Sequence, residues 1–173
     1  VLANGMAGNA EITEKNEDYA AFLEALKVLC TKLARMMAKD GEGAKHLITC
    51  TVQGAASEKS AETIAKSVIS STLTKAAIFG CDANWGRVLC AMGYSGESFD
   101  PDKVDVHFAS GAGDIAVCEQ GRGLPFDEEL AKKILSEDEV EINIQMGEGD
   151  GACTCWGCDI TYDYIKINGD YRT

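Results

Sequence analysis

The pattern of apolar positions indicates one long helix near the start of the chain. Between residues 17 and 40, apolar side chains recur at steps of three and four, as on one face of an amphipathic helix. Asn16 is expected to cap the start of this helix, and Gly41 to end it. The stripe comprises Tyr19, Phe22, Leu23, Leu26, Leu29, Cys30, Leu33, Met36 and Met37.

Shorter elements follow, and their periodicity changes from element to element. Runs rich in β-branched residues, or alternating apolar and polar ones, predict strands; steps of three and four predict helices. Asp82 and Asp127 are expected to cap the second and third of these helices. The predicted strands are 47–52, 104–108, 115–118, 140–146 and 152–167, and the predicted helices are 60–76, 85–92 and 127–135.

The order of these elements predicts an α/β fold of the α+β type. Strands and helices interleave without a regular strand–helix–strand repeat, and tight turns join several of the strands. Strand 104–108, for example, is expected to form a hairpin with strand 115–118 across a glycine-rich turn. We therefore expect mixed β-sheets with helices packed on them.

Composition narrows the range of partners. The chain has 173 residues, with 28 acidic and 16 basic side chains and a net charge of −12. Binding to a nucleic-acid backbone requires clustered Lys and Arg, so we expect no nucleic-acid partner. No apolar run approaches the roughly 20 residues that span a bilayer, so we expect no membrane association and a cytoplasmic location.

The eight cysteines allow two interpretations. Most lie at apolar positions of predicted elements, where free cysteine behaves as a small buried hydrophobe. The alternative is a metal or redox domain that uses the closely spaced Cys153, Cys155 and Cys158. If this segment is a strand, Cys153 and Cys155 face one side and Cys158 the other, which favours packed thiols over a metal site.

Two segments stand out as candidate binding sites. The turn Asp40-Gly41-Glu42-Gly43 places two carboxylates after a helix C-terminus, where the helix dipole disfavours negative charge. Such a placement suits the binding of an ammonium group, although a solvated turn has the same composition. The tail 168–173 follows the last predicted strand and offers an amide, a hydroxyl and a carboxylate, or is an ordinary exposed terminus.

His46 and His107 are interpreted as structural residues.

Several segments, in order along the chain, resemble the ornithine acetyltransferase family, also called glutamate N-acetyltransferase. The most specific of them is the closing stretch from Tyr164 to Thr173. The others are Val1-Leu2-Ala3-Asn4-Gly5, Asp40-Gly41-Glu42-Gly43-Ala44, Gly80-Cys81-Asp82-Ala83-Asn84-Trp85-Gly86-Arg87 and Trp156-Gly157-Cys158-Asp159. Ala83 and Lys45 stand where the family usually has proline and threonine.

The resemblance implies an N-terminal-nucleophile-like enzyme that cleaves its own precursor before a threonine. This threonine carries an acetyl group from N-acetylornithine to glutamate in arginine biosynthesis, and use of acetyl-CoA stays open. Val1 is not that threonine. The chain therefore resembles the β subunit without its leading portion, or a C-terminal fragment of it, and is expected to be inactive alone. The implied partners are the α subunit of the same precursor and a second αβ pair.

Matched residue by residue, the family's substrate contacts fall on Glu42, Asn168 and Thr173. The resemblance assigns no catalytic residue, metal or cofactor to this chain. It implies that residues 1–45 complete a catalytic lobe shared with the upstream part. Residues 46–173 form a mixed α/β domain whose tail returns to the active site. A further alternative is an acidic, non-catalytic interaction domain.

Overall fold

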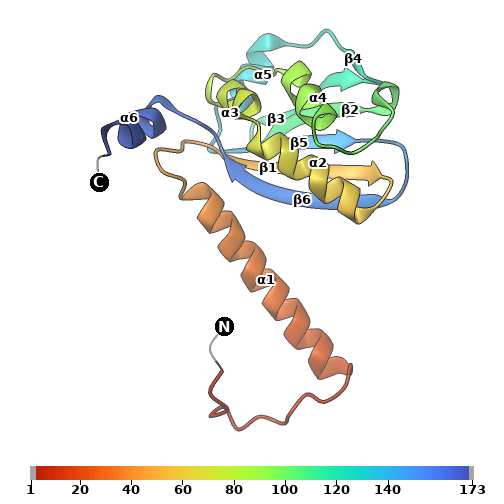
Figure 1. Cartoon of the computed structure of the whole chain (residues 1–173), viewed down its shortest axis with the longest axis vertical. Helices are drawn as coiled ribbons and strands as arrows, with labels where there is room; N and C mark the ends of the chain where they lie inside the picture. Colours follow the sequence, from red (N-terminus) through yellow and green to blue (C-terminus); the bar gives the residue numbers. More distant parts are fainter. Residues whose placement is uncertain (1–2, 172–173) are drawn as a thin grey trace. The chain divides into compact units, whose positions relative to one another are not determined.

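The computed structural model describes residues 3–171 of the chain, which divides into two compact units, Val1–Ala34 and Arg35–Thr173 (Figure 1). The first unit contains an extended segment and most of helix α1 (Glu17–Lys39). Asn16 caps α1 as predicted, because its Oδ1 accepts a hydrogen bond from the Tyr19 amide at 3.0 Å.

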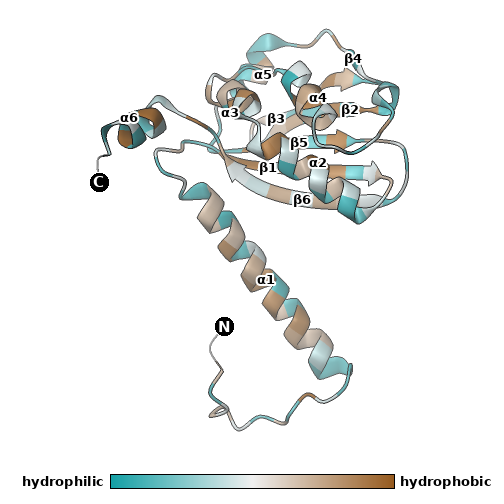
Figure 2. Cartoon of the chain, viewed as in Figure 1, coloured by the Kyte–Doolittle hydropathy of each residue, from teal (hydrophilic) through white to brown (hydrophobic). Residues whose placement is uncertain are grey.

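On the apolar stripe of helix α1, Tyr19, Leu23 and Leu26 are half-buried and the other residues are exposed. None of its residues is buried, and Figure 2 shows hydrophobic and hydrophilic positions interleaved along it. The last residues of α1 belong to the second unit, where Arg35 and Lys39 form ion pairs with Glu139 at 2.8 and 3.2 Å. Among the described helices, none combines the length and the apolar composition needed to cross a membrane.

The second unit is built on one six-stranded sheet with the strand order β4-β3-β2-β5-β1-β6. β1 pairs with β5 in parallel, and the other neighbouring strands are antiparallel. The sheet is therefore mixed, which confirms the predicted fold class. Its strands are β1 (Leu47–Ala55), β2 (Asp105–Ser110), β3 (Gly113–Glu119), β4 (Arg122–Gly123), β5 (Glu139–Gln145) and β6 (Gly151–Cys158).

Four helices cover the apolar face of this sheet (Figure 1). α2 packs on β1 and β6, α5 packs on β2 and β3, and α3 and α4 pack against α2 and each other. The helices are α2 (Glu58–Ser70), α3 (Thr72–Phe79), α4 (Trp85–Gly93) and α5 (Glu128–Leu135), with a 3-10 turn at Pro101–Lys103.

Two helix boundaries differ from the sequence prediction. The single helix predicted over 60–76 is wrong, because Ser71 leaves the helical conformation (φ −64°, ψ 114°) and caps α3 through its side chain. The cap of α4 is Asn84 and not Asp82, since Asn84 Oδ1 accepts from the Arg87 amide at 3.1 Å. Asp127 caps α5 as predicted.

The core forms where alternate residues of the central strands face the helices. Cys50 of β1 lies opposite Ile142 of β5, which in turn lies opposite Phe108 of β2. All three are essentially inaccessible to solvent. The residues between them point to the other face, where Thr51, Asn143 and His107 follow one another across the same strands. This alternation fixes the register, because a slip of one residue would bury the polar set.

The last strand is shorter than predicted, and the expected strand over 152–167 is wrong. β6 ends at Cys158, and residues Tyr162–Asp170 form helix α6. Thr161 begins this helix, because its side chain accepts a hydrogen bond from the Tyr164 amide, and Asp163 lies in the first turn. The described part of the tail, residues 168–171, therefore belongs to the end of this helix and does not follow a core strand.

Truncation of a core side chain should destabilise the second unit far more than truncation of an exposed one. Phe108 is 1% exposed, so Phe108→Ala is expected to lower the free energy of unfolding by about 3–5 kcal/mol. Leu73→Ala on α3 is the control, because Leu73 is 56% exposed and should change stability by less than about 1 kcal/mol. Urea unfolding of both variants measures the two changes in the free energy of unfolding. Equal changes would contradict the assigned core.

Candidate functional site

The segment between α1 and β1 carries the candidate carboxylate Glu42 on a tight turn. The Ala44 amide donates to the Gly41 carbonyl at 2.9 Å, which closes a turn with Glu42 and Gly43 at its centre. Gly43 has φ +69°, the left-handed region that favours glycine. A Cβ at Gly43 would lie 2.8 Å from the backbone nitrogen of Tyr164, so the turn approaches α6 closely. Glu42 itself is exposed.

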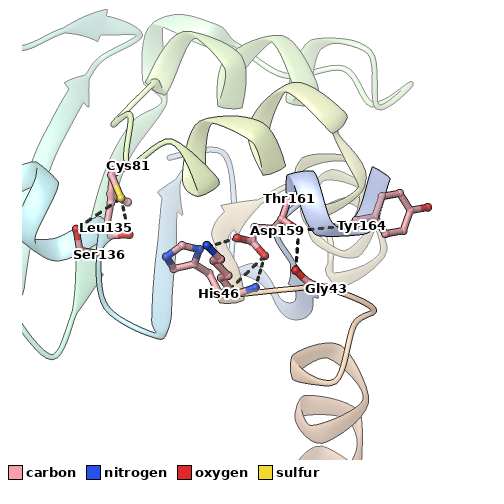
Figure 3. A network of polar contacts seen from close by, with 9 residues as sticks. Gly43, His46, Cys81, Leu135, Ser136, Asp159, Thr161 and Tyr164 are labelled. Atoms are coloured by element: carbon pink, nitrogen blue, oxygen red, sulfur yellow. Dashed lines mark hydrogen bonds and ion pairs between the residues drawn. The ribbon is translucent and has the colours of Figure 1, made fainter. Parts of the chain in front are cut away.

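The buried carboxylate of Asp159, directly after β6, holds the residues that follow this turn (Figure 3). Its Oδ1 accepts from the backbone amides of Lys45 at 2.9 Å and His46 at 3.2 Å. Its Oδ2 lies 2.6 Å from His46 Nδ1. Burial disfavours the charged carboxylate, but the His46 ring and the two amides outweigh it and lower the pKa of Asp159. The ionised carboxylate is an acceptor, so Nδ1 is the protonated ring nitrogen of His46.

Thr161 makes a second connection between the same two segments. Its hydroxyl donates to the Gly43 carbonyl at 2.6 Å and accepts from the Tyr164 amide at 3.1 Å (Figure 3). One side chain thus fixes the turn that carries Glu42 and begins the helix that carries Asn168. The Asn168 amide group then donates to Glu42 Oε2 at 2.7 Å and to the Tyr164 carbonyl at 2.9 Å.

Of the three predicted site residues, the structure brings two together. Glu42 and Asn168 are 126 positions apart in the sequence and share a hydrogen bond. Thr173 lies outside the described residues. The substrate-binding role of all three stays a prediction. What the arrangement offers chemically is a carboxylate oriented by a neutral amide donor, a combination suited to an ammonium group.

An aromatic pair borders the same segments. Phe79, at the end of α3, meets Tyr162 of α6 edge to face, with ring centroids 5.3 Å apart. The ammonium group of Lys45 lies 5.4 Å from the centroid of the Phe79 ring. This cation–π contact involves the residue immediately before His46 and three residues after Glu42. The contact adds packing to a connection otherwise made by hydrogen bonds.

The cysteines fall into different environments. Cys50, Cys118 and Cys155 are buried, as predicted, but Cys30 and Cys90 are exposed, so the prediction of burial is wrong for these two. Burial and the neighbouring Cys153 raise the pKa of Cys155 to about 11. Burial also raises the pKa of Cys50, which lies opposite Cys155 on the adjoining strand. These thiols are therefore protonated at neutral pH.

A three-cysteine metal site does not form in the described part of the chain. Cys153 and Cys155 face α2, whereas Cys158 lies on the other face, where its sulfur packs against Gly41. Among residues 3–171, no group of three or more Cys, His, Asp or Glu side chains is arranged to hold a metal ion.

Sequence reasoning missed Asp159 and Thr161 as organising residues. In the sequence, Asp159 ends a segment that matches the family, and both residues fall in the run 152–167 that predicts a strand, because Ile160, Tyr162 and Ile165 favour strands. The available signal was the pair of Thr161 and Asp163, a capping residue followed by an acid in the first helical turn.

Comparison with known proteins identifies the family. A sequence profile of the ArgJ family matches residues 1–173, and the chain belongs to this family. It is similar to the arginine biosynthesis bifunctional protein ArgJ 1 of Clostridium acetobutylicum, with 51% identity over the whole chain and 42% of that relative. The ArgJ protein of Thermotoga neapolitana is 49% identical over the whole chain and 44% of its own length. The chain thus spans about two fifths of these curated relatives.

A solved structure agrees with this assignment. The crystal structure of the arginine biosynthesis bifunctional protein ArgJ from Bacillus halodurans matches with a TM-score of 0.90 and 42% sequence identity. The match covers 96% of this chain and 77% of that one. The predicted family resemblance is thereby confirmed.

The close approach at Gly43 gives a test with a matched control. Gly43→Ala should destabilise the chain because it adds a left-handed alanine and a Cβ that collides with the α6 backbone. Gly96 also has positive φ (+89°) but has no atom within 4 Å of its would-be Cβ, so Gly96→Ala isolates the conformational cost of about 1–2 kcal/mol. We expect only Gly43→Ala to lower the free energy of unfolding beyond this conformational cost and to speed up hydrogen exchange of the α6 amides. Equal effects on both readouts would argue against the contact.

The lowered pKa of Asp159 predicts an acid-dependent contribution to stability. The folded-state pKa lies below the unfolded value of about 3.9, so the contribution is present above that pH and is lost as pH falls through the folded value. Asp159→Asn should cost about 2–3 kcal/mol at neutral pH, and the difference from wild type should shrink below about pH 4. Asp114→Asn, at an exposed His–Asp pair, is the control. A difference that stays constant down to pH 2 would contradict the assignment.

Proposed function

We propose that this chain is part of an acetyltransferase that moves an acetyl group from N-acetylornithine to glutamate in arginine biosynthesis. Membership of the ArgJ family supports the class of reaction, since the relatives are named as bifunctional proteins of arginine biosynthesis. The single observation that carries the assignment of a site is the hydrogen bond between Glu42 and Asn168. It joins two segments that the family resemblance assigns to one substrate site.

In the proposed site, Glu42 pairs with the amine of ornithine or glutamate. Asn168 holds one carboxylate oxygen, Oε2, which leaves Oε1 without a hydrogen-bond partner among the described residues. A substrate ammonium group can therefore bind Oε1 while the amide keeps the carboxylate in place. We propose that Asn168 and Thr173 also fix the amino-acid end of the substrate. Acetyl-CoA is a second acetyl donor to be tested.

The nucleophile of the reaction is proposed to lie outside this chain. A threonine at the N-terminus of the processed β subunit accepts the acetyl group, and an oxyanion hole stabilises the tetrahedral intermediate. Residues 1–45 would then complete the catalytic lobe, and the chain alone would transfer no acetyl group. The partner is the α subunit of the same precursor, within a pair of αβ units. The exposed residues of the apolar stripe of α1 support such an assembly, because Phe22, Leu29 and Leu33 are each about half exposed or more.

Replacement of Glu42 tests the proposed site directly. In the full-length protein, Glu42→Gln keeps the size of the side chain and its acceptor for Asn168 but removes the charge that binds the substrate amine. We expect kcat/KM for acetyl transfer from N-acetylornithine to glutamate to fall roughly ten- to a hundredfold, while self-cleavage persists. Glu119→Gln, at an exposed glutamate of β3, is the control and should leave the kinetics unchanged. Unchanged kinetics in Glu42→Gln would refute the role.

A further inference from the structure

The turn that bears Glu42 has no regular secondary structure, yet side chains between the end of β6 and the last turns of α6 make three connections to it and to the residues that follow it. Asp159 binds the backbone just after the turn, Thr161 binds the carbonyl of Gly43 within it, and Asn168 binds the Glu42 side chain. All three contacts come from residues more than 110 positions away in the sequence. The orientation of Glu42 therefore depends on this distant segment.

Asp159 is the buried member of this set. Only 4% of the surface of Asp159 is accessible to solvent, whereas Glu42 and Asn168 are exposed. A buried carboxylate is costly unless every oxygen has donors, and Asp159 has three: the amides of Lys45 and His46 and the ring of His46. Because one carboxylate oxygen accepts from two consecutive backbone amides, these bonds fix the backbone that leads from Glu42 into β1.

The other His–Asp pair of the chain shows what is particular here. His107 Nδ1 and Asp114 Oδ1 lie 3.1 Å apart on the hairpin of β2 and β3, and their side chains are 41% and 59% exposed. In the described residues, Asp114 makes no hydrogen bond to a backbone amide through its side chain. The His107–Asp114 pair is therefore an exposed surface contact. The Asp159 carboxylate of the His46–Asp159 pair, by contrast, also binds two consecutive backbone amides.

We propose that Asp159 is a positioning residue of the amino-acid site. It sets the orientation of the Glu42 carboxylate by holding the Lys45–His46 backbone, while Thr161 holds the Gly43 carbonyl within the turn. This inference rests on the proposed function, since it assigns a role toward the same substrate amine. Asp159 touches no substrate in this scheme; it acts only through Glu42.

A double-mutant cycle in the full-length protein tests the coupling. Asp159→Asn keeps the shape but replaces one acceptor oxygen by a donor that faces His46 Nδ1. It should raise KM for N-acetylornithine and glutamate about tenfold and change kcat less than about twofold. In the Glu42→Gln background the same substitution should change KM by less than about twofold, because the group it positions is already uncharged. Asp114→Asn should be silent in both backgrounds.

The outcomes separate this inference from the proposed function. If Glu42→Gln lowers kcat/KM but Asp159→Asn acts equally in both backgrounds, Asp159 is only a structural anchor and the positioning role is refuted. If Glu42→Gln has no effect on kinetics, the assignment of Glu42 fails, and the positioning role fails with it. If Asp159→Asn does not yield folded protein, Thr161→Val carries the same cycle, since it removes the bond to the Gly43 carbonyl. Thr161→Ser, which keeps the hydroxyl, should behave as wild type.

Discussion

The arrangement of the second unit around its candidate site depends on one buried carboxylate. Asp159 directly follows the edge strand β6 and binds the two residues that lead into the neighbouring strand β1. Without these bonds, the backbone amide and the ring of the buried His46 would be left unpaired, which costs more than the bonds themselves contribute. These hydrogen bonds therefore join the segment between α1 and β1 to the segment between β6 and α6, although the two segments are more than 110 residues apart in the sequence.

The sheet holds the strand ends from which these two segments start in fixed positions. β1 is paired on both sides, in parallel with β5 and antiparallel with β6, so its first residue Leu47 is fixed and buried. The polar loops at this end therefore start from fixed strand ends, and a small number of hydrogen bonds is enough to order them. Function placed on loops that a rigid sheet positions is a common solution in proteins.

Much of the fold follows from local patterns, whereas the site depends on contacts between distant residues. Asn16 and Asp127 cap helices as predicted, because a cap acts within three residues of its own position. Ser71 and Thr161 were missed, since apolar and β-branched neighbours masked their capping role. The hydrogen bond from Asn168 to Glu42 follows only from tertiary structure: family resemblance selected both residues, but neither spacing nor periodicity could show that they touch.

The distribution of thiols has a practical consequence for chemical labelling. The sulfurs nearest the helix-covered side of the sheet, on Cys50 and Cys155, are protonated and shielded, so alkylating reagents reach them slowly. Cys30 on α1 and Cys90 on α4 are open to solvent and sit on separate units. They offer natural attachment points for a pair of dyes that would report the separation of the two units, with the half-exposed Cys81, Cys153 and Cys158 replaced so that labelling is selective.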